Sequence, residues 1–293
     1  MDLIMRKKIF FISEVSSNHS QNIDRALEFI DQSAEVGCSA VKFQLFKVEK
    51  LFSKEVFIKF PKTYNRKKME LPNEFLPILS KRCKKKKIQF SCTPFYIEAV
   101  SELIDYVDFF KIASYELLWD DLLIECAKTK KPIVLSTGMA TIKEISHAVN
   151  IIKKNQCKQL TLLHCTSAYP TPHYDANLKA IKTLRDTFNC PVGWSDHTVN
   201  PGVINRAVNK WDAEVIEFHM DLEGYGEEFY SGHCWLPNQI GEVIRQVKNG
   251  LSSDGNGIKK PVASEKFERQ WRADPKDGLR PNRSIRKKLK KNN

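Results

Sequence analysis

The sequence predicts an α/β fold, a (β/α)8 TIM barrel followed by a basic C-terminal tail. Short β-branched or aromatic runs alternate with amphipathic stretches, which is typical of parallel strands joined by helical crossovers. The strand–helix units number eight within about 250 residues, the usual size of such a barrel. Polar residues follow almost every expected strand, at the edge where barrels place their sites.

The expected elements follow one another in strand–helix pairs along the chain. The strands are Ile9–Glu14, Ala40–Leu45, Ile88–Cys92, Phe109–Ala113, Ile133–Ser136, Leu160–Cys165, Val192–Ser195 and Val215–Met220. The helices lie near 22–36, 73–86, 96–106, 119–129, 141–154, 176–187, 201–210 and 237–250. Three helix starts carry sequence signals: Asn22 as an N-cap, Thr141 with Glu144 as a capping box, and Pro201 in a first turn.

An open doubly wound sheet would show the same alternation of strands and helices. The count of eight and the absence of a G-x-G-x-x-G fingerprint favour closure into a barrel. We therefore expect a barrel domain over residues 1–252 and a basic, partly disordered extension over 253–293. The connection from about 47 to 70 is long and rich in Lys, Phe and Tyr, so we expect it to cover the site.

Composition excludes several classes of protein. The 293 residues are 42% hydrophobic, and 47 basic against 35 acidic residues give a net charge of +12. Seven Lys or Arg and no acid lie between Arg280 and Asn293, a pattern typical of a solvated tail. Interleaved aromatic residues are missing there, so we expect no nucleic-acid partner.

The sequence has no apolar run of about 18 residues and no export signal, which predicts a cytoplasmic protein without a membrane span. Its eight cysteines form no C-x-x-C pair, so we expect reduced, mostly buried thiols.

Polar side chains share one face at the ends of several strands. Side chains alternate along a strand, so Glu217 and His219 lie opposite Ile216 and Phe218. A barrel interior is dry, and polar groups there are costly unless they are paired. Packing alone does not explain why so many polar residues lie on this face. Each has a simpler explanation by itself: the role of Lys42 could be limited to a pair with Glu14, and His164 could be a core histidine with its hydrogen bonds satisfied.

Two chemical sites are expected at this edge. His197 and His219 end neighbouring strands, and neutral imidazoles bind divalent transition ions while leaving positions for water and substrate oxygen. Lys42 and Lys111 would form an anion-binding cradle, since lysine binds phosphate as a point charge and hydroxyls supply directed bonds. The hydroxyls expected in the cradle are those of Thr93, Ser114, Ser136 and Ser195.

Eight short motifs at these strand ends resemble those of one enzyme family. Among them, SEVSSNH at 13–19 is similar to the family's A-E-I-G-x-N-H. The others are AVKFQ (40–44), SCTPF (91–95), FKIASYE (110–116), LSTGM (135–139), LHCTSAYP (163–170), GWSDHT (193–198) and VIEFH (215–219). In this order, the motifs resemble the nonulosonate (sialic acid) synthases, in particular their barrel domain. Members of the family condense phosphoenolpyruvate with an N-acylated amino sugar.

This resemblance implies roles for the matching residues. Glu14, Lys111 and Glu116 would be catalytic, with Glu14 positioning or deprotonating a water. His197 and His219 would hold a divalent metal, manganese by preference, with magnesium or cobalt as alternatives. The residues expected to bind the two substrates are Lys42, Gln44, Thr93, Ser114, Ser136, Ser167, Tyr169 and Ser195. Gln44, Glu116 and Tyr169 would face the sugar, and the resemblance also implies a homodimer.

The sequence departs from the family pattern in three places. The stretch 224–235, GYGEEFYSGHCW, replaces a G-P-D-H-x-A-S-like segment, and Phe218 stands where Lys is usual. Longer members also carry a C-terminal antifreeze-like domain that supplies an arginine to a partner's site, and we expect no counterpart of it in this sequence. Arg272, Arg280 and Arg283 are candidates to replace that arginine.

The expected activity is therefore metal-dependent condensation of phosphoenolpyruvate with an N-acylated amino sugar. Two alternatives remain open at this point. One is a barrel aldolase in which Lys111 forms a Schiff base. The other is a non-catalytic barrel that binds polyanions through its basic tail.

Overall fold

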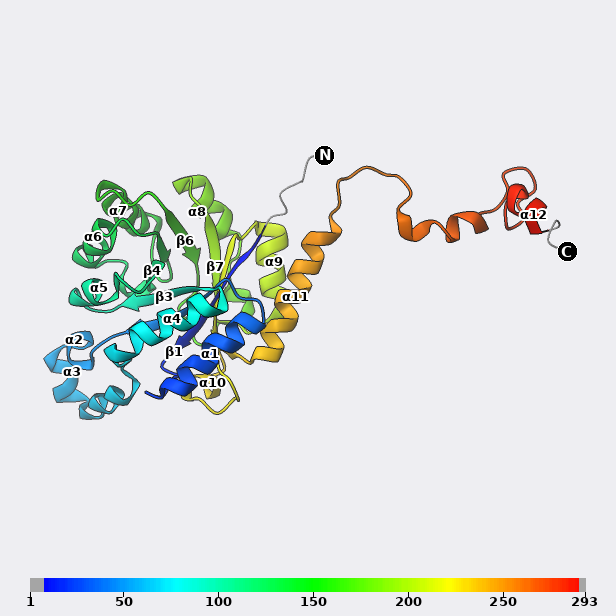
Figure 1. The fold of residues 1–293 in the computed structure, drawn as a ribbon. Coiled ribbons are helices and arrows are strands. Elements are labelled where there is room, and N and C mark those ends of the chain that lie inside the picture. Colours follow the sequence, from blue (N-terminus) through cyan, green and yellow to red (C-terminus); the bar gives the residue numbers. More distant parts are fainter. Residues whose placement is uncertain (1–7, 290–293) are drawn as a thin grey trace. The chain divides into compact units, whose positions relative to one another are not determined.

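The computed structural model describes residues 8–289, and its core is a closed barrel of eight parallel strands (Figure 1). The strands are β1 (Phe10–Ser16), β2 (Ala40–Leu45), β3 (Gln89–Pro94), β4 (Phe109–Ile112), β5 (Ile133–Ser136), β6 (Leu160–His164), β7 (Val192–Asp196) and β8 (Val215–Met220). Each pairs with the next in sequence, and β1 pairs with β8. A short ninth strand, β9 (Cys234–Trp235), pairs in parallel with β8. The predicted (β/α)8 barrel is confirmed.

Helices fill the crossovers between the strands. The principal ones are α1 (Ile23–Glu35), α4 (Leu76–Lys86), α5 (Glu98–Leu103), α6 (Asp120–Lys128), α7 (Ile142–Lys154), α8 (Ala180–Phe188), α9 (Pro201–Trp211) and α11 (Pro237–Ser253). Shorter helices are α2 (Val48–Leu51), α3 (Lys54–Lys59), α10 (Glu227–Tyr230) and α12 (Arg283–Leu289). The 3-10 helices are η1 (Pro61–Met69), η2 (Asn73–Phe75), η3 (Ser114–Glu116), η4 (His173–Asp175), η5 (Ala263–Glu265) and η6 (Glu268–Trp271).

The start signals read from the sequence act as expected in three helices. The Asn22 side chain accepts a hydrogen bond from the backbone of Arg25, and Thr141 and Glu144 form a reciprocal capping box. Pro201 occupies the first turn of α9. The expected helix at 176–187 instead begins at Ala180, because Asn177 has a φ of 39° and cannot be helical.

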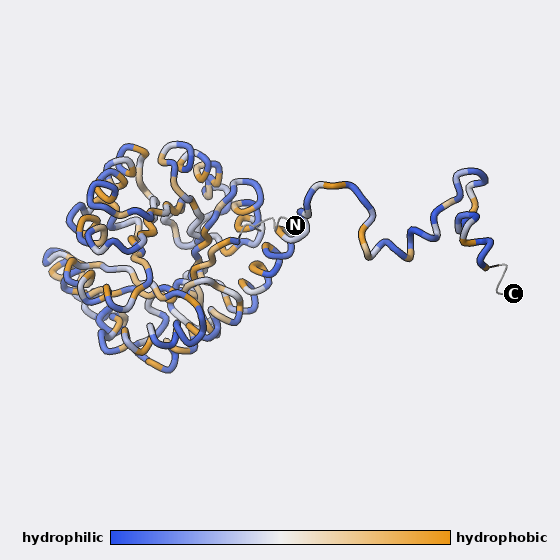
Figure 2. Tube along the Cα trace, turned by 45° about the horizontal axis from the view of Figure 1, so that its top comes forward, coloured by the Kyte–Doolittle hydropathy of each residue, from blue (hydrophilic) through white to orange (hydrophobic). Residues whose placement is uncertain are grey.

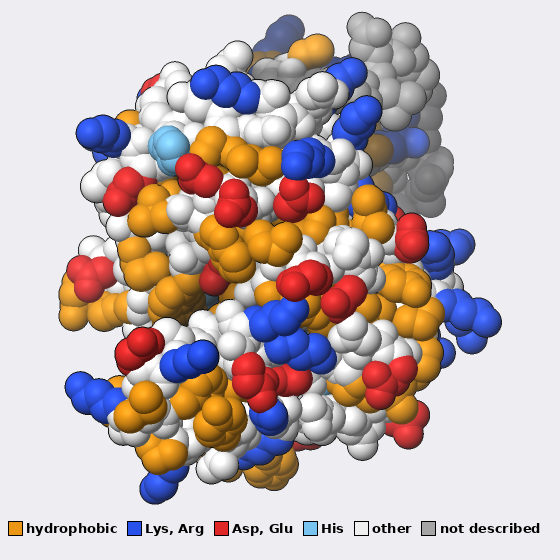
Figure 3. All heavy atoms as spheres, turned by 90° about the vertical axis from the view of Figure 1, so that its left-hand side faces the viewer, with side chains coloured by type: hydrophobic (Ala, Val, Ile, Leu, Met, Phe, Trp, Pro, Cys, Tyr) orange, Lys and Arg blue, Asp and Glu red, His pale blue; other side chains and the backbone are white. Residues whose placement is uncertain are grey.

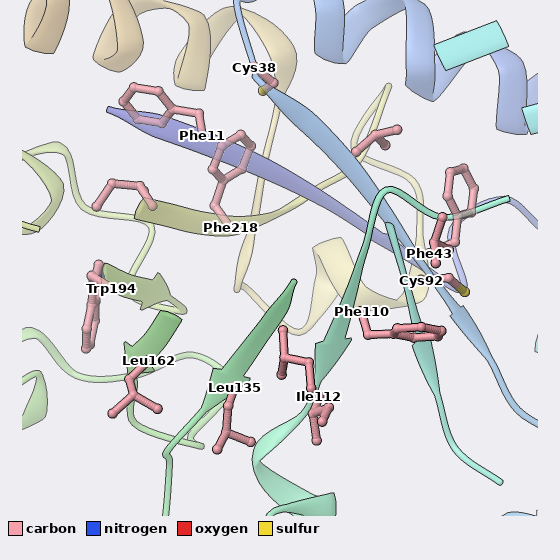
Figure 4. Close-up of a cluster of buried hydrophobic side chains, with 14 of the residues drawn as sticks. Phe11, Cys38, Phe43, Cys92, Phe110, Ile112, Leu135, Leu162, Trp194 and Phe218 are labelled. Carbon is pink, nitrogen blue, oxygen red and sulfur yellow. The ribbon is translucent and has the colours of Figure 1, made fainter. Parts of the chain in front are cut away.

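Two hydrophobic layers hold the barrel together. The outer layer lies between the strands and the helices and includes Phe11, Phe43, Phe110, Trp194 and Phe218 (Figure 4). The inner layer fills the barrel axis. It comprises Ile12, Ala40, Phe109, Val134, Leu163 and Val215. Hydrophobic residues accordingly follow the strands and the helix sides that face them, while polar residues lie outside (Figure 2).

The connection between β2 and α4 is not an irregular loop but a folded cover made of α2, α3 and η1. It is joined to the barrel by Gln21, whose side-chain amide donates to the carbonyl oxygens of Lys67 at 2.9 Å and Glu70 at 3.0 Å. The Glu70 carboxylate in turn accepts from the backbone of Val48 at 2.8 Å. One barrel face shows charges of both signs interspersed with exposed hydrophobic side chains (Figure 3).

The chain divides into two compact units after Leu251. The larger unit is the barrel with its helices. In the smaller unit, the Asp274 carboxylate accepts from the backbone of Arg283 at 2.8 Å, and Asp277 pairs with Arg286 at 2.8 Å. Helix α12 lies in the segment expected to be a basic tail, whose Lys290 and Lys291 fall outside the described residues. Within residues 8–289, no helix combines the length and apolar character that a membrane crossing requires.

Candidate active site

A cavity of about 1520 Å³ opens at the carboxyl ends of the strands. Its lining includes eleven of the thirteen residues predicted from the sequence. They are Glu14, Lys42, Gln44, Lys111, Ser114, Glu116, Ser136, Tyr169, Ser195, His197 and His219. The other two, Thr93 and Ser167, lie directly behind this lining: Thr93 accepts a hydrogen bond from Lys42, and the Ser167 hydroxyl lies against Gly138.

Strand alternation explains why these side chains meet. Each residue of the inner hydrophobic layer is followed, two positions later, by a cavity residue. The pairs are Ile12 and Glu14, Ala40 and Lys42, Phe109 and Lys111, Val134 and Ser136, Leu163 and Cys165, and Val215 and Glu217. The register aligns Glu14 with both Lys42 and His219. An apolar floor therefore supports one polar layer that runs around the barrel.

The lysine cradle expected from the sequence is present, but carboxylates already pair with both ammonium groups. Lys42 Nζ lies 2.6 Å from Glu14 and 3.9 Å from Glu217. Lys111 Nζ lies 3.3 Å from Glu217, which also accepts from the Ser195 hydroxyl at 3.0 Å. Glu217 thus lies between the two lysines. Lys42 does pair with Glu14, as its simpler explanation has it. This pair belongs to a larger network that also contains Lys111 and Glu217.

Burial and charge act in opposite directions on these groups. Burial lowers the pKa of Lys42, but the Glu14 and Glu217 carboxylates outweigh it and raise the pKa overall. Burial dominates at Lys111 and lowers its pKa against the opposing effect of Glu217. Burial would raise the pKa of Glu217, yet Lys111 and Lys42 lower it to about 2. Glu217 is therefore a carboxylate at neutral pH, between the two lysines that lower its pKa.

Hydroxyl and backbone donors complete one wall of the cavity. The Ser114 hydroxyl accepts from the backbone N–H of Gly138 at 3.0 Å and lies 3.2 Å from the Cys165 sulfur. A Cβ at Gly138 would lie 2.3 Å from the Ser167 hydroxyl, so only glycine fits there. Among residues 8–289, the buried hydroxyls of Ser136 and Ser167 find no hydrogen-bond partner. Such groups are costly to leave unsatisfied, which is expected where a polar ligand binds.

Three imidazoles and one phenol ring cluster on the opposite wall. The His197 and His219 ring centres lie 5.4 Å apart, and those of His219 and His233 lie 4.8 Å apart. Tyr169 packs over His197, with ring centres 4.3 Å apart. His197 Nδ1 donates to the carbonyl oxygen of Thr166 at 2.9 Å, and burial lowers the pKa of His197 to about 3. The His197 ring is therefore neutral, with the lone pair on Nε2.

His164, by contrast, is a satisfied core histidine, as its simpler explanation holds. Its Nε2 donates to the carbonyl oxygen of Ala176 at 2.9 Å, and its ring packs against Trp194. It is not among the residues that line the cavity.

Several cavity residues were not predicted from the sequence. Alternation did place Glu217 on the face of His219, but no role was predicted for it. Arg66 and Lys68 belong to the cover, and Arg25 belongs to α1. Glu228 and His233 lie in the segment 224–235 that departs from the family pattern, so no motif indicated them.

The comparisons with known proteins agree with this geometry. The chain is 36% identical over 273 residues to an N,N'-diacetyllegionaminic acid synthase of Campylobacter jejuni, covering 88% of this chain and 81% of the relative. It is 33% identical over 262 residues to a pseudaminic acid synthase of the same species, covering 86% and 76%. A crystal structure of the N-acetylneuraminic acid (sialic acid) synthetase of Leptospira borgpetersenii superposes with a TM-score of 0.79 at 31% identity, covering 92% of this chain and 94% of that one.

Fold, site and relatives together define a (β/α)8-barrel synthase, which confirms the predicted enzyme class. The NeuB family profile matches residues 29–259. The chain belongs to the NeuB family.

Proposed function

We propose that this protein condenses phosphoenolpyruvate with an N-acylated amino sugar and releases a nonulosonic acid and inorganic phosphate. The observation that carries the proposal is the polar layer at the strand ends, in which two buried lysines, three carboxylates and paired imidazoles surround one cavity. The similar proteins described above, which are synthases of legionaminic, pseudaminic and sialic acids, support the product class.

The charge balance of the cradle bears on how an anion would bind. Lys42 and Lys111 supply two positive charges, but Glu14 and Glu217 already balance them. A phosphate and a carboxylate entering this layer would therefore need a further cation nearby. The His197–His219 wall supports the proposal that a divalent ion supplies it.

The imidazoles fit a divalent metal, manganese by preference, with magnesium or cobalt as alternatives. Two imidazoles that share one ion at about 2.1 Å have ring centres roughly 5 Å apart, close to the 5.4 Å between His197 and His219. His197 is neutral with a free Nε2, as a ligand must be. When bound, the ion would polarise the aldehyde oxygen of the sugar.

The other residues would divide the work as follows. Lys42 and Lys111 bind the anionic groups of phosphoenolpyruvate, with hydroxyl donors from Ser136 and Ser195. Carbon C3 of the enol phosphate attacks the aldehyde carbon, whose oxygen takes up a proton. Glu14 orients a water molecule and receives a proton from it as the water adds to C2. The C2 hydroxyl of the resulting tetrahedral centre gives its proton to the departing phosphate as the C–O bond breaks and the keto group forms. Glu14 receives one proton and the aldehyde oxygen takes up one, so atoms and charge balance.

The sugar would bind at the outer part of the cavity, near Gln44, Glu116 and Tyr169. Gln44 donates to Glu14 at 2.6 Å, so the two proposed substrate positions are adjacent. Tyr169 is 41% exposed at the rim. The relatives named above are synthases of different nonulosonic acids, so the assay uses a panel of acceptors.

The direct test is release of inorganic phosphate from phosphoenolpyruvate with manganese and a panel of N-acetylated hexoses. We expect turnover with at least one of them, and Lys111→Met should lower kcat by about 10²–10³-fold, because it removes a preorganised charge. Lys128→Met is the matched control, since Lys128 is exposed on the outer surface, where it pairs with Glu125, and its activity should be unchanged.

Two results would contradict the proposal. One is equal turnover by Lys111→Met and Lys128→Met. The other is covalent trapping of pyruvate on Lys111 by borohydride, which would indicate a Schiff-base aldolase. Undiminished turnover after exhaustive chelation would contradict the proposed metal alone.

A further inference from the structure

The loop that follows β8 brings a carboxylate, Glu228, against the strand ends. Glu228 Oε2 lies 3.0 Å from Nδ1 of His219 and 3.7 Å from Nε2 of His233. Its other oxygen, Oε1, accepts a hydrogen bond from the Ser16 hydroxyl. Ser16 lies at the end of β1, just after an irregularity in the β1–β2 register, and has a φ of 51°. Both carboxylate oxygens are therefore engaged by groups from two adjacent strands.

The loop holds Glu228 in this place through a network of its own. Asp221, fully buried, accepts hydrogen bonds from the backbone N–H groups of Gly224, Tyr225 and Gly226 at 2.9–3.2 Å. Arg25 pairs with Asp221 at 3.1 Å. A Cβ at Gly226 would lie 2.8 Å from the Asn18 side-chain oxygen, so the approach of the loop to the barrel requires glycine. These contacts of the loop therefore fix the position of the Glu228 carboxylate.

The contact fixes which nitrogen of His219 carries the proton. A ring nitrogen that faces a carboxylate at 3.0 Å must donate, because a lone pair there would face a negative charge. Nδ1 of His219 therefore carries a proton, and in the neutral ring Nε2 has the lone pair. His197 has the same polarity, with Nδ1 donating to a backbone carbonyl. Nδ1 thus donates a hydrogen bond in both imidazoles, to a backbone carbonyl from His197 and to a carboxylate from His219.

We infer that Glu228 is a positioning residue that sets the tautomer and orientation of His219 so that its Nε2 can bind the divalent ion. This inference rests on the proposed function for the ion only. Histidine ligands in metal sites commonly donate their second nitrogen to a carboxylate, which fixes the ring and raises its basicity. The residue comes from the segment 224–235, where this chain departs from the family pattern.

Direct ligation by Glu228 is the competing arrangement. His219, Glu228, His233 and Cys234 have potential ligand atoms within 4.8 Å of one another. In the structure, however, His219 and Ser16 occupy both oxygens of Glu228. A direct ligand would have to give up one of these hydrogen bonds.

The test reads the tautomer of His219 in metal-free protein by long-range ¹H–¹⁵N spectra at alkaline pH, where imidazoles are neutral. We expect a proton on Nδ1 of His219 in the wild type. In Glu228→Gln, we expect the proton to move toward Nε2 and the Kd for Mn²⁺, followed by electron paramagnetic resonance, to rise about 10–100-fold. Glu228→Asp keeps a carboxylate and should restore part of both readouts.

Glu227→Gln is the matched control. It removes the same charge one position earlier in the same short helix, where the side chain is exposed and pairs with Lys68 at 3.1 Å. Its tautomer spectrum and its Kd should equal those of the wild type. If Glu228→Gln does not fold, Glu228→Asp carries the test, with intermediate changes expected.

The inference is overturned if His219 keeps the Nδ1 proton in Glu228→Gln, whatever happens to Mn²⁺ affinity, since loss of affinity alone would indicate direct ligation. Equal loss of affinity in Glu227→Gln would also overturn it, because the effect would then be one of net charge. If the tautomer changes in Glu228→Gln as expected but the wild type binds no Mn²⁺, the result would contradict the proposed ion and support the Glu228–His219 contact.

Discussion

At the scale of single residues, the site holds several ionisable side chains in buried positions, where the free energy cost of a charge is high. Glu116 illustrates the consequence. It is 8% exposed, and its Oε2 atom finds no hydrogen-bond partner among the described residues. Burial raises its pKa to about 7, although Lys111 and Lys42 act in the opposite direction. In the ligand-free protein, Glu116 thus titrates near neutral pH.

The pKa of Glu116 makes folding stability depend on pH. Because the folded state holds this proton between about pH 4.5 and 7 while the unfolded state has lost it, the free energy of unfolding should fall as pH rises through that range. Above pH 7 the penalty amounts to about 3 kcal/mol. Glu116→Gln, neutral throughout, should therefore match the wild type in acid and exceed it by up to this amount at pH 8.

Urea unfolding of both proteins at several pH values measures the difference. Glu125→Gln, on the surface of α6, serves as a control whose difference from the wild type should stay within about 0.5 kcal/mol. A constant difference between Glu116→Gln and the wild type from pH 5 to 8 would show that Glu116 does not titrate as we expect.

Sequence reasoning located most residues of the site, because strand alternation and the motifs both point to the same face. It could not find Glu228 or His233, whose positions depend on how the loop after β8 folds back. It also could not show that Lys42 and Lys111 share Glu217, since that requires the side chains of three different strands to meet.

At the scale of elements, Asp196 ties β7 to the loop that ends in β9. It is fully buried and accepts from the indole N–H groups of Trp194 and Trp235, each at 3.0 Å. Thr198 also donates to it, at 2.7 Å from its hydroxyl. The alternation rule explains most strands, but β9 has only two residues and no pattern of its own. It exists because Trp235 finds a partner on β7.

Asp196→Ala should destabilise the protein by about 3–4 kcal/mol, because it leaves two buried indole N–H groups without an acceptor. Chemical unfolding followed by tryptophan fluorescence measures this loss, and these two rings are among the five that contribute to the signal. Asp186→Ala, which removes an exposed i,i+4 partner of Lys182, should cost less than about 0.5 kcal/mol. Similar losses in the two variants would exclude the role given to Asp196.

At the scale of the whole molecule, the hydrophobic core lies entirely within the barrel unit. The larger cluster of buried hydrophobic residues ends with α11, at Val247, with Leu251 packed against it, and the inner cluster ends at Val215. In the second unit, the contacts that bury Asp274 come from Leu279 and Arg283 nearby in sequence. The fold was predictable because eight strand–helix pairs repeat one pattern. The helix in the basic segment was not, since charge alone does not distinguish it from a solvated tail.

Ending the chain at Ser253 should leave the free energy of unfolding of the barrel within about 0.5 kcal/mol of the full chain. Ending it before α11 should prevent folding, because Ile240, Val243, Ile244 and Val247 would leave the core. Each contributes about 1.5–3 kcal/mol, and together they approach the stability of a typical domain. Urea titrations of the three chains provide the comparison. A large loss in the longer truncated chain would mean that the second unit supports the barrel.

The homodimer stays a prediction, which sedimentation equilibrium would test.

The folded cover between β2 and α4 has a consequence for protein engineering. It contributes Arg66, Lys68 and Met69 to the outer wall of the cavity, while the strand ends supply the inner wall. The two walls are thus encoded by separate stretches of sequence. A library that randomises only the cover could diversify acceptor choice while every strand, and the chemistry at its end, is left as it is.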